Sequence, residues 1–147
     1  LTPVVGLLNL DNLDLRHNPV ADVTPLAQVS SLRDLSLFDT NVTDLTVLRA
    51  CPRLTTLDVG YTPITSTAAL DGLDVLQVLK IRKAPLQTLD HIETHPLLEE
   101  IYLSETQLLD LSPLLNLPRL RIVEVDGHLR TAAEAIAGQA AFKIIYP

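Results

Sequence analysis

Cysteine, glycine and aromatic residues are scarce in this sequence, and each shortage excludes a class of site. A single cysteine, Cys51, cannot form an internal disulfide framework or a thiolate zinc site, because both need several cysteines at short spacing. Five scattered glycines leave no glycine-rich loop for binding phosphate. Aromatic residues make up only 3% of the chain, so the position of each one is informative.

Long apolar runs and excess positive charge are also missing. The longest uncharged stretch is far shorter than the roughly 18 apolar residues of a membrane-spanning helix, and the opening LTPVVGLLNL lacks the basic flank of a signal peptide. A net charge of −7 repels phosphate backbones, which argues against nucleic acid as a partner. We therefore expect no membrane insertion. The localisation stays open, with the cytoplasm favoured and a secreted effector or a cell-surface protein as alternatives.

What the sequence has in abundance is leucine in a repeating pattern. Leucine recurs every 22 residues, at Leu10, Leu32, Leu54, Leu76, Leu98 and Leu120. Five complete units follow one another without a gap, and residues 1–4 keep the same phase, so we expect the chain to begin inside a repeat. A fixed period of this length indicates a stacked repeat architecture.

Each unit changes its hydrophobic period partway along. The first part alternates apolar and polar residues, as in Leu13-Asp14-Leu15, which predicts one short strand per unit and about six parallel strands in all. Apolar residues then recur every three positions, which favours a tight 3₁₀ turn over an α-helix. Pro25 and Pro113 suit the first turn of such a segment. A residue able to cap the turn precedes each one, at Asp22, Asp44, Ser66, Thr88 and Asp110.

This pattern, LxxLxLxx(N/T)x(V/I/L)xxLxxL, resembles the leucine-rich repeat family, in particular its short bacterial and SDS22-like classes, over residues 1 to about 128. The resemblance implies an α/β leucine-rich repeat fold, a right-handed solenoid with a concave parallel β-sheet and short 3₁₀ or extended convex segments. One column of equivalent positions departs from the family's usual asparagine and contains Asn18, Thr40, Thr62, Ala84, Thr106 and His128. Threonine offers fewer hydrogen bonds and alanine none, so we expect looser bonding around the fourth unit.

The repeat phase is lost near the C terminus, and residues 129–147 are expected to cap a solenoid of residues 1–128. A solenoid buries apolar surface only between neighbouring coils, so its ends need covers. Thr131 and Glu134 predict a capping box that opens an alanine-rich capping helix ending near Gly138. A strand-like alternation follows, at Phe142, Ile144 and Tyr146. No comparable cover precedes the first repeat, so we expect more repeats, a cap or another domain upstream in the full-length protein.

Two polar residues and the cysteine occupy columns that are otherwise apolar. Thr67 and His95 are the only residues in seven core columns that are not apolar, and we expect the core to be loose around them. Thr67→Val is then predicted to stabilise the fold if the hydroxyl has no partner. Cys51 shares a column with His95, so both are interpreted as buried residues, and the thiol as unreactive.

Aromatic residues lie on the face that the resemblance identifies as the working surface, the concave sheet. Phe38 follows the inward Leu37 and should therefore face outward, and Tyr61 and Tyr102 fall on the same face. Rigid exposed aromatic side chains dominate protein interfaces because they bury much area with little loss of rotamer freedom. We predict Phe38 and Tyr61 as anchors of a protein-binding face and Tyr102 as a weaker one. The alternative is that these rings only pack on their neighbours.

Charged residues divide this face into acidic, basic and acidic bands, and complete the predicted protein-binding site with Asp14, Arg16, Asp58, Lys80, Arg82 and Lys83. Lys80, Arg82 and Lys83 are expected on a single strand. Their charges either satisfy neighbouring carboxylates and rings, or form a docking point for an acidic or phosphorylated segment of a partner.

No catalytic arrangement is evident in the sequence. Asp14, His17 and Asp39 can approach one another on the sheet, but an open surface is a poor metal site or active site. We therefore expect a non-enzymatic chain that uses no metal or cofactor.

The sequence thus predicts a protein–protein interaction module, a scaffold that binds another protein, of unknown identity, on its concave face. The alternative is a sensor or autoinhibitory leucine-rich repeat region of a larger bacterial signalling or effector protein, whose concave face is occupied by another domain of the same chain. A structural spacer is the third interpretation. The use of threonine in place of asparagine favours a bacterial origin.

Overall fold

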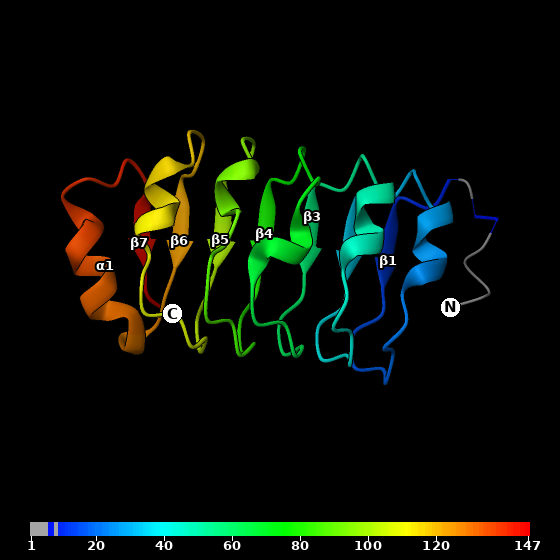
Figure 1. The fold of residues 1–147 in the computed structure, drawn as a ribbon, viewed down its shortest axis with the longest axis horizontal. Coiled ribbons are helices and arrows are strands. Elements are labelled where there is room, and N and C mark those ends of the chain that lie inside the picture. Colours follow the sequence, from blue (N-terminus) through cyan, green and yellow to red (C-terminus); the bar gives the residue numbers. More distant parts are fainter. Residues whose placement is uncertain (1–5, 8) are drawn as a thin grey trace.

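The computed structural model describes residues 6, 7 and 9–147, whose strands form one parallel sheet. Its seven strands follow in sequence order: β1 (Asn12–Asp14), β2 (Asp34–Ser36), β3 (Thr56–Asp58), β4 (Val78–Lys80), β5 (Glu100–Tyr102), β6 (Ile122–Glu124) and β7 (Lys143–Ile145). Figure 1 shows them side by side along the long axis of the molecule. The predicted solenoid is confirmed, and β7 adds a seventh strand after the repeats. The phase match predicted for residues 1–4 lies outside the described residues.

Neighbouring strands pair in a register of one repeat. Leu13 pairs with Leu35, and Leu35 pairs in turn with Leu57. Because side chains alternate along a strand, this register stacks the inward leucines and turns their polar neighbours to the other face. A slip of one residue would expose every leucine of the strand, so the hydrophobic pattern itself specifies the register.

Short 3₁₀ turns lie on one face of the sheet, in front of the strands in Figure 1, where the chain passes from one strand to the next. They span Thr24–Gln28, Thr46–Ala50, Thr67–Leu70, Ile92–Thr94 and Ser112–Asn116. Pro25 and Pro113 lie at the start of their turns, as predicted, where a missing amide hydrogen costs little. Within the described part of the chain, no helix is long and apolar enough to cross a membrane.

Four of the five predicted cap residues accept a hydrogen bond from the amide two residues further on, at 2.8–3.2 Å: Asp22, Asp44, Ser66 and Asp110. The prediction is wrong for Thr88, whose hydroxyl donates to the carboxylate of Asp90 instead. The turn that follows starts later, after His91, which has a left-handed backbone (φ 61°). Because the turn begins only at Ile92, Thr88 is no longer the residue that precedes it.

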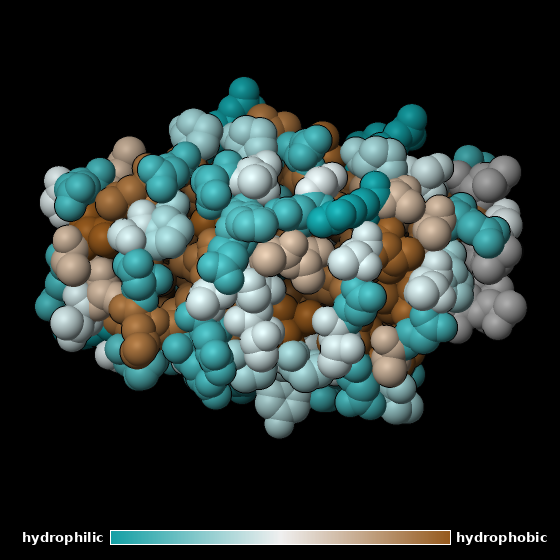
Figure 2. Space-filling model, viewed as in Figure 1, coloured by the Kyte–Doolittle hydropathy of each residue, from teal (hydrophilic) through white to brown (hydrophobic). Residues whose placement is uncertain are grey.

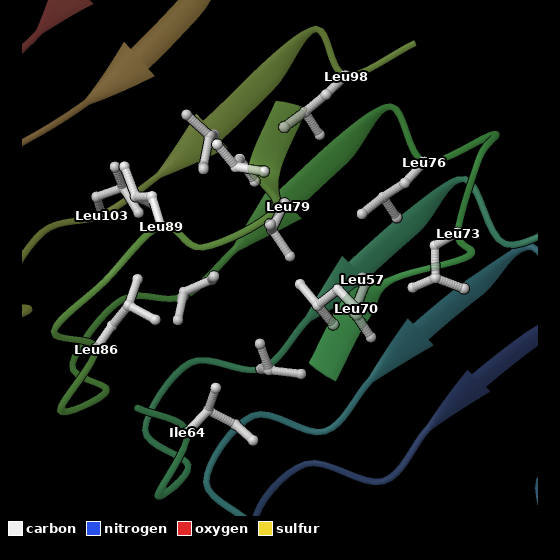
Figure 3. Close-up of a cluster of buried hydrophobic side chains, with 14 of the residues drawn as sticks. Leu57, Ile64, Leu70, Leu73, Leu76, Leu79, Leu86, Leu89, Leu98 and Leu103 are labelled. Carbon is white, nitrogen blue, oxygen red and sulfur yellow. The ribbon is translucent and has the colours of Figure 1, made fainter. Parts of the chain in front are cut away.

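The apolar columns of the repeat form one continuous core (Figure 3). Leu57, Leu70 and Leu79 each expose 1% or less of their surface, and burial of one such side chain stabilises the fold by about 1.5–3 kcal/mol. Cys51 is buried as predicted, and burial raises the pKa of its thiol. On the face shown in Figure 2, polar residues lie over much of the surface with apolar residues visible between them.

The two polar residues in the core columns are hydrogen-bonded, where we expected looseness. Thr67 is fully buried, and its hydroxyl donates to the backbone carbonyl of Asp90 at 2.7 Å. His95 is also fully buried, with Nε2 3.0 Å from the carbonyl oxygen of Leu70 in the preceding coil. The expectation was wrong because both side chains link one coil to the next through backbone groups more than 20 residues away.

Threonines occupy three of the repeat positions that are usually asparagine in the family, and each bonds within its own coil. The hydroxyls of Thr40, Thr62 and Thr106 donate to the carbonyl oxygen three residues earlier, at 2.7, 2.5 and 2.9 Å. Ala84 is buried in the same column and offers no such bond, as expected from its side chain. Each threonine thus satisfies one buried carbonyl at the point where the chain leaves the strand.

The helix after the repeats, α1 (Arg130–Ala137), begins differently from the prediction. Thr131 lies inside the helix, and no capping box forms at its start. The chain enters through a 3₁₀ turn, Gly127–Leu129, whose cap is Asp126: its carboxylate accepts the amide of His128 at 3.1 Å. The end at Gly138 is as predicted. Buried Ala133 and Ile136 join the core, and β7 extends the sheet beside β6.

Candidate functional site on the concave sheet

Each of the first five coils turns sharply just beyond its strand, and the turning residue is not glycine. The five turning residues have φ between 54° and 61°: His17, Asp39, Tyr61, Lys83 and Glu105. The left-handed conformation costs an L-residue roughly 1–2 kcal/mol, so a side chain is retained here at the expense of stability. These residues, which we call the lip, present a row of side chains along one edge of the concave face.

The N-terminal half of the concave face contains a hollow of about 350 Å³. We call it the concave hollow; its lining is Asn12, Leu13, Asp14, Arg16, Asp34, Leu35, Ser36, Thr56, Asp58 and Lys80. The small side chains of Ser36 and Thr56 lie on adjacent strands beneath longer charged neighbours, so the surface is depressed there. Four predicted site residues meet in this hollow, namely Asp14, Arg16, Asp58 and Lys80.

The charges of the concave hollow are only partly balanced within the protein. Asp14 and Arg16 form an ion pair at 2.6 Å, and this guanidinium lowers the pKa of the Asp14 carboxyl. Asp58 accepts the amide of Gly60 at 3.0 Å. Among residues 6, 7 and 9–147, no cation forms an ion pair with Asp34 or Asp58. The hollow therefore has two carboxylates whose charge is not neutralised by a paired side chain.

The aromatic anchors predicted from the sequence lie against each other beside this hollow. The rings of Phe38 and Tyr61 are stacked with centroids 6.2 Å apart, and His17 meets Phe38 edge-on at 5.5 Å. Tyr61 is 57% exposed, whereas Phe38 is half-buried. Phe38 lies over Gly60, because a Cβ built on Gly60 would come within 2.8 Å of the Phe38 ring. The outward orientation of Phe38 was predicted; its packing across a glycine was not.

In the C-terminal half of the concave face, polar side chains form hydrogen bonds with one another. Arg82 donates to both carboxylate oxygens of Glu124, at 2.6 and 2.5 Å, and the hydroxyl of Ser104 donates to one of them at 2.7 Å. Despite burial, the Arg82 guanidinium lowers the pKa of Glu124. Glu124 was missed because it lies two coils from Arg82 in sequence. The only signal is that small Ser104 separates the two long side chains.

Tyr102 is part of this bonded region rather than a free anchor. Its ring lies beneath the guanidinium of Arg82, 4.5 Å from the ring centroid, and its hydroxyl donates to Glu100 at 2.6 Å. This hydrogen bond to a carboxylate raises the pKa of the Tyr102 hydroxyl. Ring and hydroxyl are thus both engaged within the protein.

The basic residues do not share one strand, contrary to the prediction. Only Lys80 lies in β4, while Arg82 and Lys83 follow in the turn because the chain leaves the sheet after three residues. Lys83 pairs with Glu105 on the lip at 3.6 Å. The Lys80 ammonium lies 5.9 Å from the Tyr102 ring centroid. Intramolecular partners thus account for most of this charge.

His17 and Asp39 meet on the lip, with His17 Nδ1 2.8 Å from the Asp39 carboxylate. Asp14 belongs to the Arg16 pair instead. Within the described residues, no group of three or more histidine, cysteine or acidic side chains is placed to hold a metal ion. The three residues considered together from the sequence are therefore divided between two pairs.

Comparisons with known proteins agree with this architecture. A family model described as leucine-rich repeats in two copies matches residues 30–75, and no curated protein matches the chain in sequence. Internalin C2 of Listeria monocytogenes has a similar structure, with a TM-score of 0.86 and 26% identity over 100% of this chain and 66% of its own. A second internalin of that bacterium has a TM-score of 0.80 and 25% identity, over 99% of this chain and 46% of its own. A leucine-rich repeat protein of Leptospira interrogans shares the fold. Its TM-score is 0.78 and its identity 22%, over 93% of this chain and 38% of its own.

The stacked coils and open parallel sheet define a solenoid of the class that generally serves as a protein-interaction module. The chain has the leucine-rich repeat fold, and its residues 30–75 match the leucine-rich repeat family model. Proteins of this class are typically non-enzymatic. The chain spans less than two thirds of the length of each of the three neighbours.

Proposed function

We propose that this chain binds a partner protein on its concave face, through Tyr61, Phe38 and the concave hollow, and that it catalyses no reaction. The observation that carries the proposal is the contrast between the two halves of the face. An open hollow lies beside two stacked rings in the N-terminal half, whereas the polar groups of the C-terminal half bond to one another. Unsatisfied groups and exposed rings are what a partner can use.

The predicted site residues take different roles in this proposal. Tyr61 is the main anchor because more than half of its surface is free to be buried. Phe38 supports it from below and contributes one face of its ring. Arg82 and Tyr102 stabilise the C-terminal half of the face, since each donates a hydrogen bond to a glutamate carboxylate. Lys80 and Lys83 affect the rate at which a partner associates, as charges at the edge of an interface generally do.

The organisation of the chain is part of the proposal. We assign residues 1–128 to the solenoid and 129–147 to a C-terminal cap, supported by the helix and strand that cover the last coil. Bacterial origin is supported by the three bacterial neighbours, and the short repeat is consistent with the SDS22-like class.

The proposal is tested by selecting binders from a random-sequence displayed peptide library and measuring their affinity for variants. Tyr61→Ser removes the exposed ring from the concave face and should weaken binding about thirtyfold, which corresponds to about 2 kcal/mol. Leu109→Ser is the matched control, because Leu109 is 81% exposed and lies outside the sheet. It should leave affinity unchanged. Binders that lose affinity with Leu109→Ser and ignore Tyr61→Ser would place the binding surface elsewhere.

A further inference from the structure

The concave hollow has carboxylates on both sides of a floor of small side chains. Strands β2 and β3 pair Asp34 with Thr56 and Ser36 with Asp58, so the two aspartates occupy diagonal positions around the two short residues. Diagonal neighbours on one face of a sheet are separated by about 7–8 Å. A cationic group lowered between them would lie within reach of both carboxylates.

The cations nearest to this floor are held by other groups. Arg16 is bonded to Asp14 through both its Nε and a terminal nitrogen, at 2.7 and 2.6 Å. Lys80 pairs in the sheet with Asp58, yet its ammonium is near the Tyr102 ring and makes no ion pair with either aspartate. Arg16 is also close enough to Asp58 for their charges to attract each other without forming an ion pair, so the charged lining of the hollow is three aspartates against Arg16 and Lys80, a net charge of −1. A cation from outside is therefore the complementary occupant.

The size and surroundings of the hollow favour a side chain over a separate small molecule. Its volume of about 350 Å³ is at the small end of ligand pockets, which are about 300–1,000 Å³. The exposed ring of Tyr61 belongs to the same face, so a chain that fills the hollow has an apolar surface for its neighbouring residues. Arginine fits such a site well, since its planar guanidinium bonds carboxylates and stacks on rings.

We propose that the partner inserts an arginine or lysine side chain into the concave hollow, where it forms ion pairs with Asp34 and Asp58. This assignment rests on the proposed binding at the concave face and names the chemistry of the partner. The basic side chain provides specificity through charge, and the segment beside it packs on Tyr61 and Phe38. A partner with an acidic residue at this position is rejected by the same two carboxylates.

The test uses peptides selected from the random-sequence displayed library and resynthesised with single changes. Selected peptides should be enriched in arginine or lysine at one position. Replacing that arginine by citrulline, which keeps its shape and loses its charge, should weaken binding about tenfold. The double variant Asp34→Asn/Asp58→Asn should cause a similar loss. The matched control Glu93→Gln/Glu134→Gln removes the same charge from exposed positions outside the sheet and should have no such effect.

The outcomes separate this inference from the proposed function. Peptides that need Tyr61 but tolerate citrulline and both asparagine substitutions would overturn the basic-residue assignment and leave concave binding intact. Peptides that ignore Tyr61→Ser would count against concave binding itself. If the library yields no binder, NMR titration with N-acetyl-arginine amide decides: shifts at the amides of Asp34, Ser36 and Asp58 support the assignment, and their absence overturns it. N-acetyl-citrulline amide is the uncharged control.

Discussion

At the scale of single residues, Gly60 determines the position of Phe38. The ring lies where the side chain of residue 60 would be, and an added Cβ would come within 2.8 Å of the ring and 2.9 Å of the carbonyl oxygen of Arg82. Phe38 is further restrained by His17 on one side and Tyr61 on the other. The missing side chain at residue 60 therefore organises the aromatic group before any partner arrives.

Gly60→Ala is expected to lower the free energy of unfolding by about 1–3 kcal/mol, since the new methyl group overpacks the ring and a backbone carbonyl. It should also shift the NMR signals of the Phe38 ring. Gly127→Ala is the control, because nothing lies within 4 Å of a Cβ at that position and the position is not left-handed. Equal melting temperatures for the two variants would contradict the packing of Phe38 across Gly60.

Thr67 gives a second residue-scale prediction, opposite in sign to that made from the sequence. Thr67→Val removes the hydrogen bond from the buried Thr67 hydroxyl to the Asp90 carbonyl, so we expect the free energy of unfolding, measured by heat or denaturant, to fall by about 0.5–1.5 kcal/mol. Thr43→Val provides a control at an exposed position and should be nearly neutral. A stabilised Thr67→Val protein would show that the hydroxyl bond contributes little.

These residues mark the limit of what could be predicted from the sequence. Alternation with Leu37 was enough to turn Phe38 outward, because one residue of offset decides the face. Its half-burial depends on the missing Cβ of Gly60 in the next coil. The Arg82–Glu124 pair spans 42 residues and depends on the length of two side chains across Ser104. Such contacts are set by three-dimensional proximity, which no local pattern encodes.

At the scale of elements, strands and turns were predictable because the hydrophobic period changes from two to three within every repeat. The helix start was not, because two cap signals compete there. Thr131 and Glu134 have the spacing of a capping box, but Asp126 caps a 3₁₀ turn that runs directly into α1. Asp126 acts as the cap because it comes first, and the chain is already helical when it reaches Thr131.

The aspartates that cap the 3₁₀ turns make the elements sensitive to acid. The hydroxyls and amides of Thr24 and Thr46 lower the pKa values of Asp22 and Asp44, with the hydroxyl as the larger cause, and the amide of Ser112 does so for Asp110. A carboxylate whose pKa is lower in the folded state stabilises the fold above its unfolded value, near 3.8. That contribution is lost as pH falls from about 3.8 through the lowered pKa.

We therefore expect the melting temperature to fall steeply below about pH 4, and the fall to be shallower in Asp44→Asn, which has no proton to gain. At neutral pH Asp44→Asn should melt at or below the wild-type temperature. Asp74→Asn changes an exposed loop aspartate outside the turns and should retain the full acid dependence of the wild type. The measurement is thermal unfolding at a series of pH values. Parallel curves for wild type and Asp44→Asn would contradict the role of the cap.

At the scale of the whole molecule, stability is distributed along one axis. Each coil contacts chiefly its two neighbours, so protection of a coil depends on how well both sides are covered. The first coil is the least covered of the described repeats: Leu13 and Leu15 are half-buried, whereas Leu35 and Leu37 in the next coil expose 2% or less. The other end is covered by α1 and β7. In a polypeptide limited to residues 1–147, stability should therefore rise from β1 towards the middle of the sheet.

Hydrogen exchange measures this gradient directly. Amides that bond the first coil to the second, such as those of Leu15 and His17, should exchange faster than those of Val59 and Ile81 in the middle coils. A peptide bound in the concave hollow as proposed should slow exchange most in the first three coils, which supply most of the lining of the hollow. Uniform exchange along the solenoid would instead mean that all coils open together. Slowing confined to the C-terminal strands would mean that the peptide binds away from the hollow, because ligand protection is greatest in the segment whose opening the ligand prevents.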